Sequence, residues 1–163
     1  MELVVNTIST GVGATMLVDG WALLRRAWLG VPLPNYALVG RWFAHMPRGR
    51  FRHASMAGVP AVRGEQALGW LAHYAIGIAF AALLPLVWGT GWMHQPRLVP
   101  ALVVGVLTVA APFLLMQPAM GLGLAASRTP RPAAARWHSL VTHAVFGLGL
   151  YATASLLKWH FPA

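Results

Sequence analysis

The stretch LGWLAHYAIGIAFAALLPLVW, residues 68–88, decides the fold of this chain. It contains no Asp, Glu, Lys or Arg, and its one titratable imidazole is His73. About 20 apolar residues in a helix are enough to cross a bilayer. A shorter apolar stretch, HAVFGLGLY at residues 143–151, contains the same pattern His-x-x-x-Gly as residues 73–77. Both stretches therefore predict membrane helices, and an ionisable side chain inside such a helix is a functional hypothesis by default.

The composition supports a membrane protein. Of the 163 residues, 58% are hydrophobic and only 9% are charged, compared with about 25% charged in soluble domains. The net charge of +9 lies in short segments between apolar runs, as in cytoplasmic loops, so we expect no nucleic-acid binding. The absence of Cys excludes disulfides, thiolate metal sites and a Cys nucleophile.

Four apolar runs predict an all-α integral membrane protein, a four-transmembrane-helix bundle in a single domain of residues 1–163. The spans are expected at about 3–24, 66–88, 98–116 and 138–157. In the first span, Gly11, Thr15 and Asp19 are spaced four apart, so they share a face that a neighbouring helix can approach closely.

The connections between spans carry further patterns. Val39, Trp42, Phe43 and Met46 repeat at helical spacing after Pro34-Asn35, which predicts a short interfacial helix in the first cytoplasmic loop. Pro112 and Pro118 each delete a helical hydrogen bond, so the third span should be broken near its end. Residues 119–126 are apolar but too short to cross, and their backbone needs partners from protein or water.

The distribution of Lys and Arg predicts the orientation. Residues 25–63 contain seven Arg and residues 127–137 contain three, whereas the other side has only Arg97 and Lys158. Both Arg-rich loops should therefore be cytoplasmic and both termini periplasmic. The second helix of each helical hairpin then contains a His-x-x-x-Gly motif. Two interpretations of this similarity remain open: the two hairpins form a parallel repeat, or the motif recurs by chance.

Several motifs resemble those of a known family. They are Gly13-Ala14-Thr15, Asp19-x-Trp21, Asn35-Tyr36-x-x-x-Gly40-Arg41-Trp42, Pro47-Arg48-Gly49-Arg50-Phe51, Gly69-Trp70-x-x-His73-Tyr74, Gln117-Pro118-Ala119-x-Gly121-x-Gly123 and Ala126-Ser127-Arg128-Thr129-Pro130. Over nearly the whole chain they resemble the small bacterial inner-membrane proteins catalogued as domain of unknown function 2938. The resemblance implies a multi-pass protein of the bacterial inner membrane and supplies no activity, cofactor or substrate.

Polar side chains lie at similar depth in the predicted spans. Asp19, His73 and His143 should lie ~8, ~10 and ~8 Å inside the cytoplasmic ends of their helices, and Gln117 closes the third span. We expect the first three to line one polar pocket, with closest polar atoms within roughly 8 Å. The alternative for each His is an ordinary interhelical hydrogen bond.

Arg48, Arg50 and Arg52 should lie near the inner mouth of that pocket. Arg recognises phosphate and carboxylate by paired hydrogen bonds, so an anionic ligand or the anionic lipid headgroups of the bilayer would suit them. Ordinary topology-determining charges are the alternative interpretation.

Three functions fit these patterns. The first is binding or transport of a small anionic ligand through a cytoplasm-facing pocket. The second is a structural or assembly protein that contacts lipid or a partner. The third is a redox protein in which His73 and His143 ligate a haem or a metal ion. The chain has only three carboxylates and no zinc or phosphate-binding motif, so we predict no catalytic residue and do not expect an enzyme. A homodimer would enclose a ligand path more completely than one thin bundle of four helices.

Overall fold

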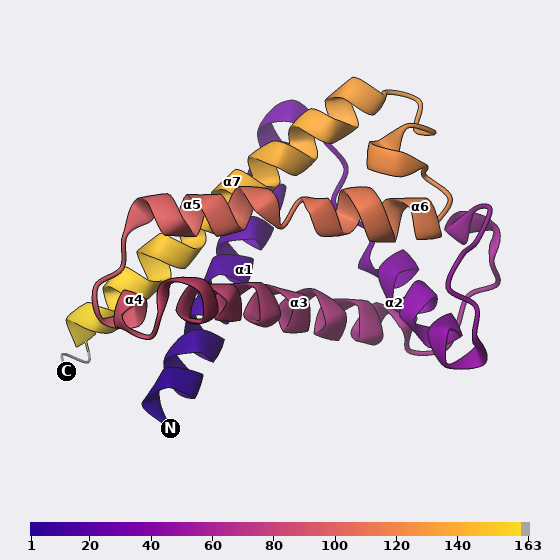
Figure 1. The fold of residues 1–163 in the computed structure, drawn as a ribbon. Coiled ribbons are helices and arrows are strands. Elements are labelled where there is room, and N and C mark those ends of the chain that lie inside the picture. The colour runs from indigo at the N-terminus through magenta and orange to yellow at the C-terminus, as the bar shows by residue number, and fades with distance from the viewer. Residues whose placement is uncertain (161–163) are drawn as a thin grey trace. The chain divides into compact units, whose positions relative to one another are not determined.

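The computed structural model describes residues 1–160, with side chains as far as Lys158. All regular structure in this range is helical, without any strand, which confirms the all-α prediction. The longer helices are α1 (Glu2–Leu29), α2 (Tyr36–His45), α3 (Glu65–Trp88), α5 (Leu98–Leu107) and α7 (Pro132–His160) (Figure 1). The short elements are η1 (Met46–Arg48), η2 (Met56–Gly58), α4 (Gly91–His94), the π-helix η3 (Ala111–Met116), α6 (Gln117–Ala119) and η4 (Leu124–Ala126).

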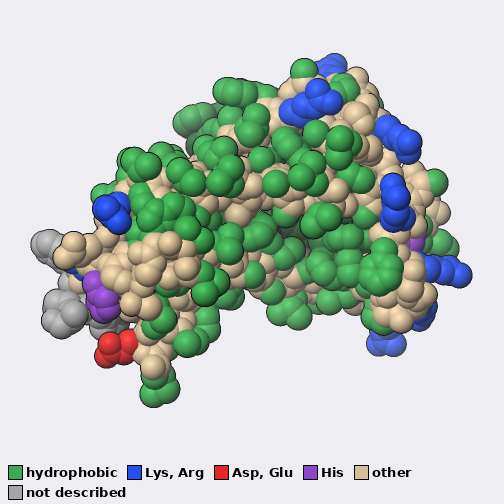
Figure 2. All heavy atoms as spheres, viewed as in Figure 1, with side chains coloured by type: hydrophobic (Ala, Val, Ile, Leu, Met, Phe, Trp, Pro, Cys, Tyr) green, Lys and Arg blue, Asp and Glu red, His purple; other side chains and the backbone are tan. Residues whose placement is uncertain are grey.

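Three helices of the described chain are long and apolar enough to cross a membrane. They are α3, the run Leu98–Ala119 and the part Pro132–Lys158 of α7. Apolar side chains on them are widely exposed, as the hydrophobic surface in Figure 2 shows, and such surface is unusual in soluble proteins. The 28-residue helix α1 is not among the three, because its polar residues, including Asn6 and Asp19, lower its mean hydropathy.

Two helix ends differ from the prediction. Helix α1 continues past Arg25 and Arg26 to Leu29, because Arg is a good helix former and the first residue able to end the helix is Gly30, which has φ 63°. Helix α7 begins at Pro132 rather than near His138, since Pro is favoured at a helix start and three Ala follow it. The second basic loop is therefore shorter than predicted. The predicted periplasmic C-terminal end lies outside the described residues.

The chain forms two compact units, which we describe separately. Unit 1 comprises Met1–Leu33, Tyr74–Thr108 and the chain from Val141 onward, and unit 2 comprises Pro34–His73 and Val109–Leu140. Helices α3 and α7 each contribute one part to each unit.

In unit 1, α1 packs closely against α3 through the face predicted from its spacing. A Cβ added at Gly11 would lie 2.5 Å from the Cα of Ile78, and one added at Gly77 would collide with the Thr15 hydroxyl. One turn farther along α1, the Tyr74 hydroxyl donates a hydrogen bond to Asp19. The pairs run in opposite sequence directions, so the two helices are antiparallel here. The prediction that this face meets a neighbouring helix is confirmed.

The rest of unit 1 uses the same small-residue packing. A Cβ at Gly105 of α5 would lie 2.5 Å from the Cα of Gly147 in α7, and one at Gly149 would lie 2.9 Å from the Cα of Ala14 in α1. Without side chains at these points, the helix backbones approach each other closely. The buried apolar core of the unit fills the remaining space and comprises Ala14, Val18, Ala81, Leu84, Trp92, Met93, Ala101, Val104, Phe146, Leu150 and Ala154.

In unit 2, the predicted short helix exists as α2, and it packs on the first turns of α3. A Cβ at Gly40 would collide with the carbonyl of Glu65, and one at Gly69 would collide with the carbonyl of Tyr36. The Arg41 guanidinium then binds both carboxylate oxygens of Glu65, at 2.8 and 2.7 Å. Such a bidentate pair is geometrically specific. It holds α2 at the beginning of α3, and the interfacial position of α2 remains a prediction.

The third apolar helix is broken, as its prolines predict. Helix α5 ends at Leu107, a turn follows at residues 108–109, and the π-helix η3 begins at Ala111. Pro112 has no N–H for the carbonyl of Thr108, so the α-helical ladder fails there. The apolar stretch after α6 obtains backbone partners from protein, because the amides of His53 and Met56 donate to the carbonyls of Ala119 and Met120.

Candidate functional site

Asp19 lies half-buried on α1 in unit 1. The Tyr74 hydroxyl donates to its Oδ2 at 2.9 Å. A lone carboxylate in a membrane helix costs about 2.5–3.5 kcal/mol on insertion scales, and a phenol is one of the few donors that can approach it from an apolar helix. Tyr74 was not selected from the sequence, although it directly follows His73.

His143 lies on α7 in unit 1, and its hydrogen bonds define its tautomer. Its Nδ1 lies 3.1 Å from the Gly105 carbonyl and 3.1 Å from the Thr108 hydroxyl, while that hydroxyl donates to Gly105 at 2.7 Å. A carbonyl only accepts, so Nδ1 carries the proton and Nε2 of the neutral ring keeps its lone pair. One sequence feature indicates this partner, since Thr108 is the only hydroxyl residue between Leu98 and Met116.

His73 lies on α3 in unit 2 and belongs to an aromatic cluster. Its Nε2 and the Tyr36 hydroxyl share a hydrogen bond of 3.0 Å, and the two rings stack with centroids 4.3 Å apart. The Trp70 ring packs against Tyr36 at 4.5 Å. His73 is therefore held by the first residue of α2, which packs on α3 through Gly40 and Gly69.

The three predicted pocket residues thus have different hydrogen-bond partners. Asp19 and His143 belong to unit 1 and His73 to unit 2, so their convergence on one pocket remains a prediction. The described side chains, those of residues 1–158, contain no group of three or more His, Cys, Asp or Glu arranged to hold a metal ion. The proposed ligation of haem or metal by His73 and His143 is likewise untested.

Gln117 begins α6 in unit 2, immediately after the π-helix η3. Its side chain is 8% exposed, and its Oε1 has no hydrogen-bond partner within the described chain. A buried amide oxygen without a donor costs roughly 1–3 kcal/mol, and π-helical turns are frequent at functional sites. The neighbouring turn η4 contacts both α6 and η3 and contains two Ala residues with positive φ, Ala125 and Ala126. Among the predicted site residues, Gln117 is the one with a buried polar atom that lacks a hydrogen-bond partner in the described chain.

Unit 2 carries most of the positive charge. It contains eight of the twelve Lys and Arg residues and one acidic residue, a net charge of +7. Glu65 is bound by Arg41, and none of the other seven Arg forms an ion pair with a described residue. The three predicted anion-binding residues, Arg48, Arg50 and Arg52, are all exposed. Figure 2 shows Arg side chains gathered over this part of the chain.

His45 ends α2 beside this charge and was not selected from the sequence. Its ring lies 5.3 Å from that of His53 in an edge-on contact, and both of its nitrogens are buried without a hydrogen-bond partner in the described structure. Burial lowers the pKa of His45, and the charges of His53, Arg48, Arg50 and Arg41 lower it further. The protonated form of this ring is therefore disfavoured in the folded protein.

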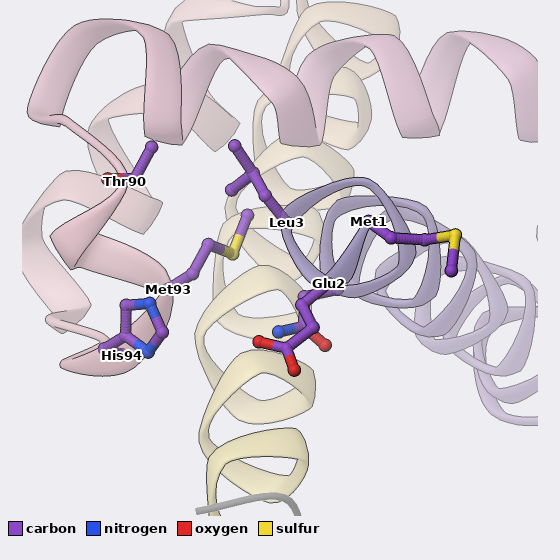
Figure 3. Close-up of a pocket in the computed structure, with 7 residues that line it drawn as sticks. Met1, Glu2, Leu3, Thr90, Met93 and His94 are labelled. Atoms are coloured by element: carbon purple, nitrogen blue, oxygen red, sulfur yellow. The ribbon is translucent and has the colours of Figure 1, made fainter. Parts of the chain in front are cut away.

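A separate pocket of about 650 Å³ lies in unit 1, where the start of α1 meets α4. In Figure 3, Met93 and His94 lie on one side of it and Glu2 on the other. Its lining consists of Met1, Glu2, Leu3, Asn6, Thr90, Met93 and His94. None of these residues was predicted, and their side chains include the carboxylate of Glu2 and no Lys or Arg. The pocket therefore does not match the anion site expected from the sequence.

Comparison with known proteins identifies a family of unknown function. The family described as "Protein of unknown function (DUF2938)" matches residues 8–157. No curated protein and no solved structure matches the chain. Because the family match covers more than nine-tenths of the sequence, the chain belongs to this family, as its motifs predicted.

Proposed function

We propose that this member of the DUF2938 family is a multi-pass protein of the bacterial inner membrane that binds or moves a small anionic ligand at the break in its third span. In this proposal α1 is a fourth span, the Arg-rich segments face the cytoplasm and the N-terminus faces the periplasm. The support for the topology is the asymmetry of Lys and Arg together with the three apolar helices.

The observation that carries the proposal is the buried Gln117 oxygen, which has no hydrogen-bond donor among the described residues. A ligand with an O–H or N–H beside its acidic group would supply that donor. The oxygen is closed off in this conformation, so binding requires the segment around it to open. The broken helix η3 and the positive-φ residues Ala125 and Ala126 are the places where the backbone is least regular, and strained backbone tends to cluster at such sites.

The charge of unit 2 supports an anion rather than a cation. A net charge of +7 on exposed loops raises the local concentration of anions and their rate of arrival. Arg48, Arg50 and Arg52 contribute to this attraction. In the proposal, Asp19, His73 and His143 provide the polar path inside the helices, since each is a titratable group in an otherwise apolar segment.

The test is ligand-induced stabilisation of the purified full-length chain. Thermal unfolding midpoints are measured with inorganic phosphate, glycerol 3-phosphate, malate and citrate, each against chloride at equal ionic strength. Gln117→Met is the test variant, because Met keeps the side-chain length and removes an oxygen that has no partner in the described part of the chain, so the variant should still fold. Gln66→Met is the matched control, an exposed Gln on the first turn of α3.

We expect at least one anion to raise the midpoint of the wild type and of Gln66→Met but not that of Gln117→Met. If no anion shifts the wild type, or if all three proteins shift equally, the site at Gln117 is wrong. The structural alternative, a protein that contacts lipid or a partner without a small ligand, then becomes the better account.

A second candidate, haem binding, is favoured by the tautomer of His143. An imidazole that donates Nδ1–H to a backbone carbonyl presents Nε2 in the form that metal-ligating His residues use. Tyr36 shares a hydrogen bond with Nε2 of His73, so that ring would have to ligate through Nδ1 or exchange its partner. A Soret absorption band in the purified protein that is lost in His143→Ala would replace the ligand proposal.

A further inference from the structure

An exposed aromatic ring lies between two exposed cations at residues 50–52, which we call the 50–52 tip. The Phe51 side chain is 56% exposed, and Arg50 and Arg52 are also exposed, without an ion pair to any described residue. A large apolar side chain fully surrounded by water would lose favourable burial of roughly 1.5–3 kcal/mol. The combination of a bare ring and flanking cations is typical of residues at a membrane interface.

The backbone of the tip is fixed at three points. The amide of Arg50 donates to the carbonyl of His45 at 3.3 Å, and the Trp42 indole donates to the carbonyl of Phe51 at 2.8 Å. On the far side, the amide of His53 donates to the carbonyl of Ala119 at 2.8 Å. The three side chains therefore project from a held backbone rather than from a free loop, so little backbone entropy remains to be lost on contact.

These anchors also fix the level of the tip relative to an apolar helix. Ala119 is the last residue of the run Leu98–Ala119, which is long and apolar enough to cross a bilayer. The next hydrogen bond, from the amide of Met56 to the carbonyl of Met120 at 3.0 Å, keeps the following loop at the same end. Where such a helix ends, the lipid headgroups begin.

We propose that the 50–52 tip docks on anionic phospholipids of the leaflet at this end of the third span. Phe51 inserts at the boundary between headgroups and acyl chains, and Arg50 and Arg52 bind lipid phosphates. A cation near an anionic bilayer surface strengthens the contact roughly fivefold. The one acidic residue of unit 2, Glu65, is bound by Arg41, so the counterions of the tip have to come from outside the unit. The inference is independent of the ligand proposed at Gln117.

The chain contains no Cys, so a single introduced Cys can be labelled cleanly. Phe51→Cys carries a nitroxide, which is apolar and of similar size to the ring it replaces. The full-length protein is reconstituted in nanodiscs of phosphatidylcholine alone or of phosphatidylcholine with phosphatidylglycerol. The relative accessibility of the label to oxygen and to a water-soluble nickel complex gives its depth. Ala57→Cys, exposed on η2 of the same unit, is the control position.

We expect the label at position 51 to be more accessible to oxygen than to nickel in anionic nanodiscs. In neutral nanodiscs, or with Arg50→Gln and Arg52→Gln added, its nickel accessibility should rise several-fold, while the label at position 57 does not respond to lipid charge. Equal depth of the label at position 51 in both lipids overturns the proposal. Immobilisation of that label by inorganic phosphate in neutral nanodiscs also overturns it, since the tip would then be a site for a soluble anion.

Discussion

The two His-x-x-x-Gly segments have the same pattern and use it differently. At His143, the imidazole bonds to the Gly105 carbonyl of α5 and to the hydroxyl of Thr108 directly after that helix, and α7 packs against α5 in unit 1. At His73, the imidazole pairs with the phenol of Tyr36, which belongs to α2 in unit 2. The spacing therefore predicts the packing of a helix, whereas the partner of the histidine depends on which other segment reaches it.

The two glycines of the pattern do have one function in common. Both Gly77 and Gly147 face an earlier helix of unit 1 at a distance that leaves no room for a side chain. The contact differs in kind, because Gly77 meets the side chain of Thr15 and Gly147 meets the backbone at Ala101 and Leu102. A side chain can be shortened by mutation and a backbone cannot, so the two positions should differ in how they can be rescued.

The largest effect should come from filling these two positions. We expect Gly77→Leu and Gly147→Leu each to destabilise the protein by about 3 kcal/mol or more, because overpacking against a backbone or a buried side chain forces helices apart. Gly20→Leu on α1 is the control, since a Cβ there meets nothing within 4 Å. The measurement is the thermal unfolding midpoint and the yield of monodisperse protein.

Rescue then separates the two segments. Thr15→Ala removes the hydroxyl that opposes Gly77, and the remaining Cβ would lie at an ordinary 3.4 Å from an added methyl. The Thr15→Ala and Gly77→Ala double variant should therefore recover most of the stability that Gly77→Ala loses. The methyl group of Gly147→Ala would lie 2.8 Å from the Ala101 carbonyl oxygen. Because a side-chain substitution does not remove a backbone carbonyl, we expect no second substitution at Ala101 to rescue Gly147→Ala. Tolerance of Leu at either glycine would remove the packing argument for that segment.

Much of this packing was predictable and the site was not. The four-residue spacing of Gly11, Thr15 and Asp19 identified the face that contacts α3, because helical periodicity is a local property of the sequence. The break before Pro112 followed from one missing amide proton. In contrast, the hydrogen bond between Tyr36 and His73 joins residues 37 positions apart and depends on how α2 folds back on α3. Neither spacing nor hydropathy contains that information.

A smaller effect should distinguish the two histidine environments. Tyr36→Phe keeps the stacked ring and removes the hydroxyl that pairs with His73, whereas Thr108→Val leaves His143 bonded to the Gly105 carbonyl. We expect a loss of about 1 kcal/mol for Tyr36→Phe and about half of that for Thr108→Val. Denaturant unfolding of the two variants and the wild type measures it. A larger loss for Thr108→Val would show that the hydroxyl rather than the carbonyl holds His143.

The smallest effect should be a dependence of unit 2 on pH through His45. Its two ring nitrogens are buried and have no hydrogen-bond partner among the residues that the structure describes. This burial lowers its pKa in the folded protein, and the charges of His53, Arg48, Arg50 and Arg41 lower it further. The unfolded chain then binds more protons than the folded one as the pH falls below about 6.5. Stability should therefore be complete well above that value and decline as the pH falls through it toward the lower pKa of the folded state. His45→Leu removes the titrating group and should flatten this decline, while His94→Leu, at an exposed position of unit 1, should leave it unchanged. The unfolding midpoint of the three proteins across this pH range is the measurement, and an equal slope for wild type and His45→Leu would show that another group controls the response.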